Sequence, residues 1–352
     1  QALAYEQALD DLSALTGLTG KDLAGLEEVA KGLQTINING VEIVSTGPEI
    51  LNALKLVGGA QPELLKNADA LGEVTRQAII LSKASGDGLE PSVVALTTVL
   101  GQFKAGASES ARIINELAAG AKEGASEIPD TTEALQKFGT VAKIANVSTG
   151  ESIALIELLA DRQLKGAEAG TQLRSVLTKL AGADVLPKSA QEQFKRLNID
   201  VNVLKDSTLP LEVRLRELGK ANGDIAALTK IFGLETLQAA TIITSGIPKY
   251  QELTQSIQGT SEATKQAGIR ADNTNTSFEN LKNKGLNQLQ DAFLKGTPVT
   301  RGLADVLSVL IDRVNLVQGA FNVAIGPIAT AIDGITDSWE RLTSLFGSSD
   351  TG

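Results

Sequence analysis

The apolar residues of this chain recur with the spacing of an α-helix over most of its length. Leu96–Phe103 and Leu173–Leu180 both place apolar side chains at i, i+3, i+4 and i+7, which is one face of a helix. Aromatic residues make up only 3% of the chain, so a buried core must be built from Leu, Ile, Val and Ala. Such a core suits closely packed helices better than a β-sandwich. The sequence therefore predicts an all-α fold.

Signals for helix starts and stops are dense, which predicts many helices of ordinary length joined by tight turns. A hydroxyl or carboxylate followed three residues later by Glu can satisfy two free backbone N–H groups at a helix start. Five segments fit this pattern: Thr46–Glu49, Asp130–Glu133, Ser148–Glu151, Thr276–Glu279 and Asp337–Glu340. Glycine-containing breakers lie between the periodic stretches, at 58–59, 85–88, 182 and 246–248.

Two parts of the chain align with each other and predict repeated antiparallel helix hairpins. Ser92–Ala118 aligns with Glu151–Thr178 with a one-residue gap, and the segments upstream also correspond, so the units span about 62–120 and 129–180. Leu/Ala-rich helices can align by chance, but both segments share a turn with Lys and Gly. We therefore favour a duplication whose units bury their faces on one another.

Changes in composition and hydrophobic pattern divide the chain into three parts. Residues 1–250 form the helical core, in which the alternating run Ile199–Val203 predicts a short extended insertion. Residues 251–285 are polar and predict a linker or a solvated helix at a domain boundary. Residues 286–352 predict a more elongated C-terminal part, made of amphipathic to apolar helices.

The residue types that are missing exclude most catalytic chemistry. The chain has no Cys, so it has no disulfides, zinc-thiolate sites or thiol nucleophiles, and it has no His for a catalytic triad. It also has no Met, so we expect a processed or excised segment of a longer protein. Acidic pairs remain as candidates for glycoside hydrolysis: Asp10–Asp11, Glu27–Glu28 and Glu123 with Glu127. Helix capping and solubility explain them better, and we expect no enzyme activity, cofactor or metal.

The charge balance disfavours binding to polyanions. The net charge is −10, so the surface repels phosphate, and we expect no specific nucleic-acid site. Lys179, Lys188, Lys195 and Arg196 are candidates for a local basic patch, but solvated side chains on helix exteriors are the favoured interpretation. Arg174 is expected to pair with an acid across its hairpin.

One apolar segment is just long enough to cross a bilayer. Val314–Ile332 carries no formal charge, but Asn315, Gln318, Asn322 and the Gly326-Pro327 pair weaken it as a membrane span. Burial in a helical bundle is favoured, with transient membrane contact as the alternative. Trp339 beyond the segment is expected to serve simple packing.

Five segments in the same order resemble phage tail tape measure proteins. Gly166–Leu180 resembles the most recognisable stretch of that family, a helix opened by small residues after a Lys/Gly turn. The others are Glu49–Gly72, similar to its earlier helix pairs; Leu197–Asn202, similar to its extended insertion; Ile231–Ala240, similar to its Phe-Gly-centred helix; and Phe278–Gly296 before Pro298, similar to its amphipathic exit helix. The resemblance covers roughly residues 10–310.

The resemblance implies a structural protein of the virion that occupies the tail tube lumen, sets tail length and assists DNA ejection. Its implied partners are copies of itself, the tail tube protein, tail assembly chaperones, and baseplate or tail-tip proteins. It would be made in the host cytoplasm. Two other classes stay open: an α-helical pore-forming or membrane-interacting protein unrelated to phage tails, whose residues 303–335 would insert into liposomes, and a secreted muramidase that depends on one Glu.

Overall fold

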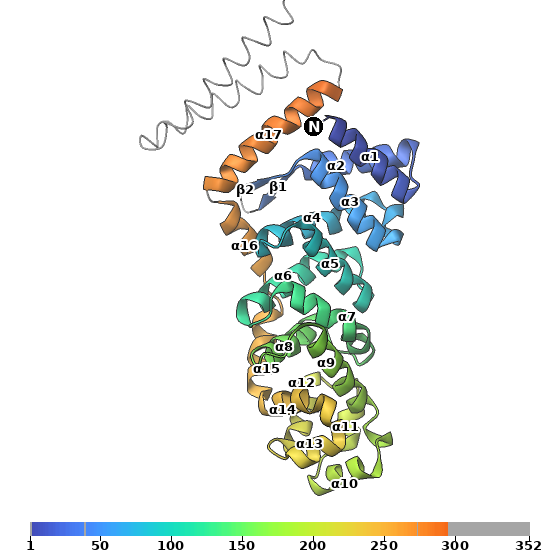
Figure 1. Cartoon of the computed structure of the whole chain (residues 1–352), viewed down its shortest axis with the longest axis vertical. Coiled ribbons are helices and arrows are strands. Elements are labelled where there is room, and N and C mark those ends of the chain that lie inside the picture. The colour runs from blue at the N-terminus through green and yellow to red at the C-terminus, as the bar shows by residue number, and fades with distance from the viewer. Residues whose placement is uncertain (1, 39, 273, 295–352) are drawn as a thin grey trace, which may run out of the picture. The chain divides into compact units, whose positions relative to one another are not determined.

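The computed structural model describes residues 2–38, 40–272 and 274–294, and the all-α prediction is confirmed for them (Figure 1). The chain divides into two compact units, the first spanning Leu3–Lys284 and the second beginning at Gly285. The first unit begins with α1 (Ala2–Thr16), α2 (Gly20–Leu33), β1 (Thr35–Ile38), β2 (Val41–Val44), α3 (Gly47–Ala60), α4 (Ala68–Ser85), α5 (Leu89–Phe103), α6 (Ser110–Glu123), α7 (Ile128–Ile144), α8 (Thr149–Ala160) and α9 (Gly166–Ala181). Short 3₁₀ turns join some of them, including η1 (Pro62–Lys66) and η5 (Leu234–Thr236).

The later elements are shorter. They are α10 (Lys188–Arg196), α11 (Val201–Lys205), α12 (Leu211–Leu218), α13 (Ile225–Phe232), α14 (Leu237–Ser245), α15 (Ile247–Ile257), α16 (Glu262–Ala271) and α17 (Thr274–Leu294). Residues 295–352, with the apolar segment Val314–Ile332 and Trp339, lie outside the described residues.

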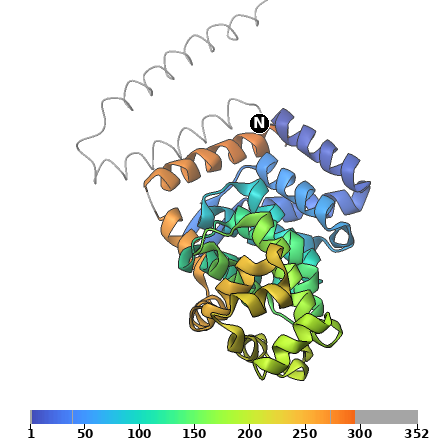
Figure 2. The same cartoon turned by 60° about the horizontal axis from the view of Figure 1, so that its bottom comes forward.

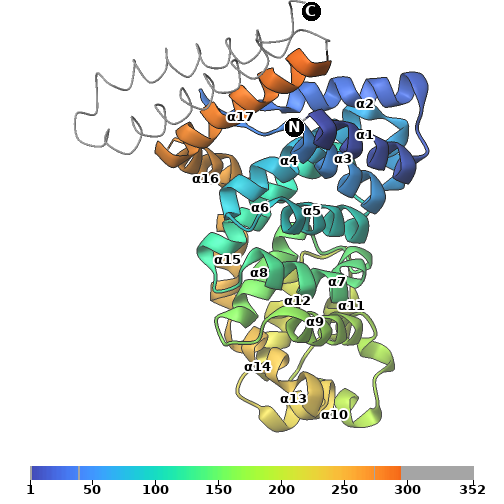
Figure 3. The same cartoon turned by 45° about the horizontal axis from the view of Figure 1, so that its top comes forward.

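The first unit is a stack of helices (α2–α16). The chain runs along the stack in one direction and then returns along it, so later helices pack on earlier ones. On the way out α4 packs on α2, α3 and α5, then α5 on α7 and α7 on α9, with α6 beneath α4 and against α8. The chain turns back through α10–α13, the yellow-green and yellow ribbons (Figure 2). On the way back α14 packs on α8 and α9, α15 on α8 and α6, and α16 on α6 and α4 (Figure 3). Helices far apart in sequence therefore share one core.

The sheet in the described residues is a two-stranded hairpin that the sequence reading did not predict. β1 pairs antiparallel with β2 in the register Thr35↔Val44, Ile36↔Ile43, Asn37↔Glu42 and Ile38↔Val41. Ile36, Ile38 and Ile43 are buried in the core. Gly40 lies in the turn with a φ of +88°, which glycine adopts without strain.

The extended insertion expected at Ile199–Val203 is wrong, because this stretch begins a helix. Asp200 is the N-cap of α11, and its carboxylate accepts from the backbone N–H of Asn202 at 2.9 Å. The alternation of Ile199, Val201 and Val203 is therefore not a strand pattern here, since a capped turn satisfies the backbone locally.

The structure confirms some of the expected helix starts and contradicts others. The Ser148–Glu151 capping box is confirmed at α8, with the Ser148 hydroxyl accepting from the Glu151 N–H at 3.2 Å and the reverse bond at 2.9 Å. At α3 the Glu49 carboxylate accepts from the Thr46 N–H at 2.8 Å. Two starts are wrong. Helix α7 begins with Glu127 at the N-cap position, without a side-chain capping bond, rather than with Asp130, since Pro129 fits its first turn. Helix α17 is already helical at Thr274. Asp337–Glu340 lies outside the described residues.

Both aligned segments fold as two helices joined by a turn. Ser92–Ala118 runs through α5 and α6, and Glu151–Thr178 runs through α8 and α9. Their origin by duplication stays a prediction. Residues 251–285 contain the end of α15, all of α16 and the first part of α17, and the domain boundary expected among them also stays a prediction.

Glycines at helix crossings let the layers approach closely. A β-carbon on Gly170 of α9 would lie 2.3 Å from the carbonyl oxygen of Ala134 in α7. One on Gly139 of α7 would lie 2.8 Å from Gln102 of α5, and one on Gly72 of α4 would lie 2.7 Å from Val29 of α2. Of these three positions, 170 requires glycine most strictly, because the atoms that a β-carbon would meet belong to the backbone and cannot rotate away.

Replacing Gly170 should therefore reverse the usual benefit of alanine in a helix. We expect Gly170→Ala to lower the free energy of unfolding by roughly 1–3 kcal/mol, because the new methyl group overpacks the α7–α9 crossing. Gly25→Ala in α2 is the matched control: its β-carbon would meet nothing within 4 Å, so alanine should stabilise by up to about 1 kcal/mol. Urea unfolding followed by circular dichroism measures both, and equal effects of the two changes would contradict the close crossing.

Candidate functional site

The acidic pairs that the sequence singled out each have a structural neighbour. Glu27 accepts from the Tyr5 hydroxyl at 3.3 Å and pairs with Lys31 at 3.0 Å. Asp11 pairs with Lys55 at 3.5 Å, and Glu123 pairs with Lys122 at 3.5 Å. Asp10, Glu28 and Glu127 are exposed, and Glu127 is the N-cap of α7. These carboxylates are spread over α1, α2 and the α6–α7 turn, where they stabilise helices and solvate the surface.

The basic residues around α10 have separate surroundings. Lys179 donates to the carbonyl of Phe232, and burial lowers the pKa of its ammonium. Arg196 pairs with Asp224 and donates to Gln193 at 2.9 Å. Lys188, Lys195 and Arg174 are exposed, and Arg174 forms no ion pair with any residue that the structure describes. The contacts of Lys179 and Arg196 hold helix ends together, whereas Lys188, Lys195 and Arg174 are solvated on helix exteriors.

The most perturbed carboxylate of the described residues is Glu157, which the sequence reading did not single out. Its side chain is fully buried on α8, a helix whose remaining central residues are apolar. Its Oε2 accepts from the backbone N–H of Ser126 at 2.9 Å, and its Oε1 lies 3.2 Å from the hydroxyl of Thr131. The Thr131 hydroxyl also lies 3.1 Å from that of Ser126. Glu157 thus ties α8 to the turn between α6 and α7.

Space for this carboxylate comes from a glycine in the same turn. A β-carbon on Gly124 would lie 2.2 Å from the Glu157 Oε2. Burial raises the pKa of Glu157 to about 8, the largest cause being loss of hydration, while the hydrogen bonds from Ser126 and Thr131 act in the opposite direction. At neutral pH the group is therefore mostly protonated, and its neutral carboxyl bridges two helices.

Arg214 is a second buried ionisable group that the sequence reading missed. It is 1% exposed on α12, and burial lowers its pKa. Its Nε donates to the carbonyl of Leu204 at 2.9 Å, and its Nη1 donates to the carbonyl of Ala145 at 3.1 Å. These carbonyls lie at the C-terminal ends of α11 and α7, where the helix dipoles favour a cation. Arg214 therefore fastens two helix ends to α12.

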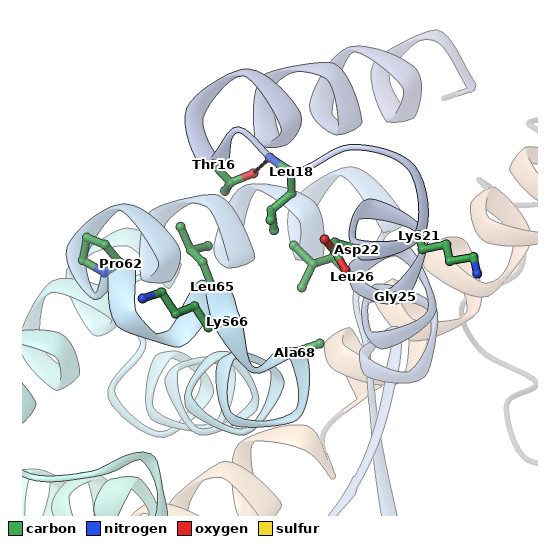
Figure 4. Close-up of a pocket in the computed structure, with 10 residues that line it drawn as sticks. All are labelled: Thr16, Leu18, Lys21, Asp22, Gly25, Leu26, Pro62, Leu65, Lys66 and Ala68. Carbon is green, nitrogen blue, oxygen red and sulfur yellow. Dashed lines mark hydrogen bonds between the residues drawn. The ribbon is translucent and has the colours of Figure 1, made fainter.

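An open groove lies between α2, the α1–α2 turn and η1 (Figure 4). Its volume is about 590 Å³, and Leu18, Leu26 and Leu65 extend into it from three elements. Lys21 extends to the side, and Asp22 lies next to Leu26. Thr16, Lys21, Asp22 and Lys66 also line the groove, so it mixes apolar and polar side chains. The polar groups do not converge on one point, which differs from the usual lining of a catalytic pocket.

The described residues contain neither a cluster of acidic side chains suited to a metal ion nor a helix suited to a membrane. In the parts of the chain that the structure covers, no group of three or more Asp or Glu side chains is placed to hold a metal ion. Within the same residues, none of the helices combines the length and the apolar character needed to cross a membrane. The buried ionisable groups Glu157 and Arg214 bind a turn and two helix ends, so their role in the described residues is to hold the helical stack together.

The raised pKa of Glu157 predicts how stability depends on pH. The folded chain holds this proton more tightly than the unfolded chain, whose carboxyl has a pKa of 4.5. The contribution of Glu157 to stability is therefore fully present below pH 4.5 and is lost as the pH rises through about 8, an effect on the order of a few kcal/mol. Glu157→Gln keeps the shape and places an amide where the neutral acid stood.

We expect urea midpoints of the wild-type chain to fall between pH 5 and pH 9 more steeply than those of Glu157→Gln. Glu192→Gln on α10 is the control, because Glu192 is exposed and should leave the wild-type slope unchanged. Equal slopes for the wild type and Glu157→Gln would show that the Glu157 carboxyl does not titrate on unfolding.

The chain is similar in sequence to known phage tail proteins. A family model described as phage-related minor tail protein matches residues 49–233, more than half of the chain. The chain is 22% identical over 333 residues to the tape measure protein of Pneumococcus phage Dp-1, covering 92% of this chain and 27% of that protein. It is 23% identical over 287 residues to the probable tape measure protein of Escherichia phage P2, covering 78% of this chain and 34% of that protein. No solved structure matches.

The chain thus spans about a third or less of the length of these relatives. The resemblance predicted from five ordered segments is confirmed by both relatives and by the family model, whose range includes Gly166–Leu180. The chain belongs to the phage-related minor tail protein family.

Proposed function

We propose that this chain is a structural, non-enzymatic region of a phage tail tape measure protein that lies in the lumen of the tail tube. The observation that carries the proposal is the match to two tape measure proteins over 92% and 78% of the chain. The buried Glu157 and Arg214 support a structural role, because their side chains form hydrogen bonds with backbone groups of neighbouring elements.

The proposed partners follow from this location. The chain would contact further copies of itself, the tail tube protein, and baseplate or tail-tip proteins in the virion. Before assembly, in the host cytoplasm, tail assembly chaperones would cover its apolar surfaces, for which the groove at Leu18, Leu26 and Leu65 is a candidate. A net charge of −10 favours release of DNA over its retention, which suits a role in DNA ejection.

The stack also bears on how this region would set tail length. A single extended helix advances about 1.5 Å per residue, but layers that pack side by side advance less. The region Leu3–Lys284 would therefore add less to the tail than its residue count suggests.

Chemical labelling of intact tails tests the proposed location. The chain lacks Cys, so Ser189→Cys on exposed α10 introduces one defined thiol into it. We expect a bulky maleimide to label this thiol in the isolated chain and to leave it unlabelled in intact tails, because the tube wall excludes the reagent. Mass spectrometry of the labelled peptide measures both, and equal labelling in intact tails would contradict a position in the lumen.

Tail length provides a second measurement. Phage particles whose tape measure gene lacks residues 3–284 should assemble tails that are shortened by less than about 1.5 Å per deleted residue, as seen by electron microscopy. Unchanged tail length would show that this region takes no part in length determination.

A further inference from the structure

The first part of α17 contacts the outer edge of the β-hairpin through side-chain amides. The Oδ1 of Asn280 accepts from the backbone N–H of Val44 at 3.0 Å, and its Nδ2 donates to the carbonyl of Glu42 at 2.6 Å. The Nδ2 of Asn283 donates to the carbonyl of Val44 at 2.8 Å. All three bonds join residues that lie more than 230 positions apart in the chain.

These amides take the place of a third strand. Glu42 and Val44 lie two residues apart on β2, so their backbone groups point to the same side of the strand. That side is opposite β1, where an edge strand presents unpaired N–H and C=O groups. The Asn280 amide donates to one of these groups and accepts from another, as the peptide group of a neighbouring strand would do.

A further described contact at this edge is also polar. Lys284 pairs with Glu42, and their side chains are 37% and 47% exposed. No residue of α17 from Glu279 to Lys284 belongs to the apolar core that the described residues form. A protein hydrogen bond contributes about 0.5–1.5 kcal/mol net, and an exposed ion pair contributes less than about 1 kcal/mol. The described contacts of residues 279–284 with the β2 edge are therefore weak beside the apolar burial that holds α4, α6 and α16 together.

We propose that the first part of α17 is a clasp: Asn280, Asn283 and Lys284 bind the β2 edge and release it while the helical stack stays folded. Release disconnects the first part of α17 from the N-terminal hairpin. Glu42 then leaves a charged side chain on the uncovered edge, which discourages pairing with a strand of another molecule. This inference concerns the isolated chain and stands independently of the proposed function.

Amide hydrogen exchange followed by NMR tests the clasp on the full chain. We expect the Val44 N–H of the wild type to exchange much faster than that of Leu81, a fully buried residue of α4 that exchanges through global unfolding. In the double variant Asn280→Ala/Asn283→Ala the exchange of Val44 should accelerate by about tenfold or more, with the Leu81 rate and the Tm unchanged. Lys282→Ala is the matched control, since this exposed residue lies on the same helix between the two asparagines.

A covalent closure keeps the proposal testable if the asparagine variants fold poorly. Glu42→Cys/Lys284→Cys introduces the only thiols of the chain, and a short bifunctional thiol reagent should join them. The cross-linked protein should exchange the Val44 amide more slowly than the wild type. The clasp is overturned if Val44 exchanges as slowly as Leu81 in the wild type, if the double variant leaves the Val44 rate unchanged, or if the thiols cannot be joined in a folded chain.

Discussion

The close approach of helix backbones at glycine positions is the constraint on which this structure depends. Aromatic residues are scarce, so the helices pack mainly with Leu, Ile, Val and Ala, and only a few aromatic side chains such as Phe138, Phe194 and Phe232 are buried among them. Gly170 lets α9 lie directly against the backbone of α7, and Gly139 brings α7 onto α5 in the same way. Small spacing then lets short aliphatic side chains reach the neighbouring layer and bury their surface, which supplies the main driving force for folding.

Buried polar groups complement this apolar packing at the places where the chain changes direction. Glu157 fixes the α6–α7 turn to α8, and Arg214 fixes the ends of α7 and α11 to α12. Gln172 does the same for the returning chain, because its Oε1 accepts from the backbone N–H of Ala239 at 3.0 Å. An apolar contact tolerates sliding between layers, whereas each of these directional bonds is satisfied in one arrangement only.

The local pattern predicted the helices well because their periodicity and caps lie within a few residues of each other, as at Ser148–Glu151. The hairpin has a readable signal in the sequence, the Asn39-Gly40 dipeptide between Thr35–Ile38 and Val41–Val44. The run Ile199–Val203 has the same alternation, but Asp200 caps a helix there. Glu157 is recognisable in the sequence as the one charge in the apolar central part of α8, beyond the capping Glu151. Its partners at Ser126 and Thr131 are not recognisable there, since they depend on how the helices pack.

The retraced path of the chain has a mechanical consequence. Helices α14, α15 and α16 contact the outgoing helices in reverse order, so α16 lies on α6 and α4, whereas α14 lies on α8 and α9. Tension applied at the C-terminal end of α16 would load the α16–α4 and α16–α6 contacts first and those of α15 and α14 afterwards. The returning strip would then peel away one layer at a time, at a force set by a single layer, rather than shear from the whole stack at once.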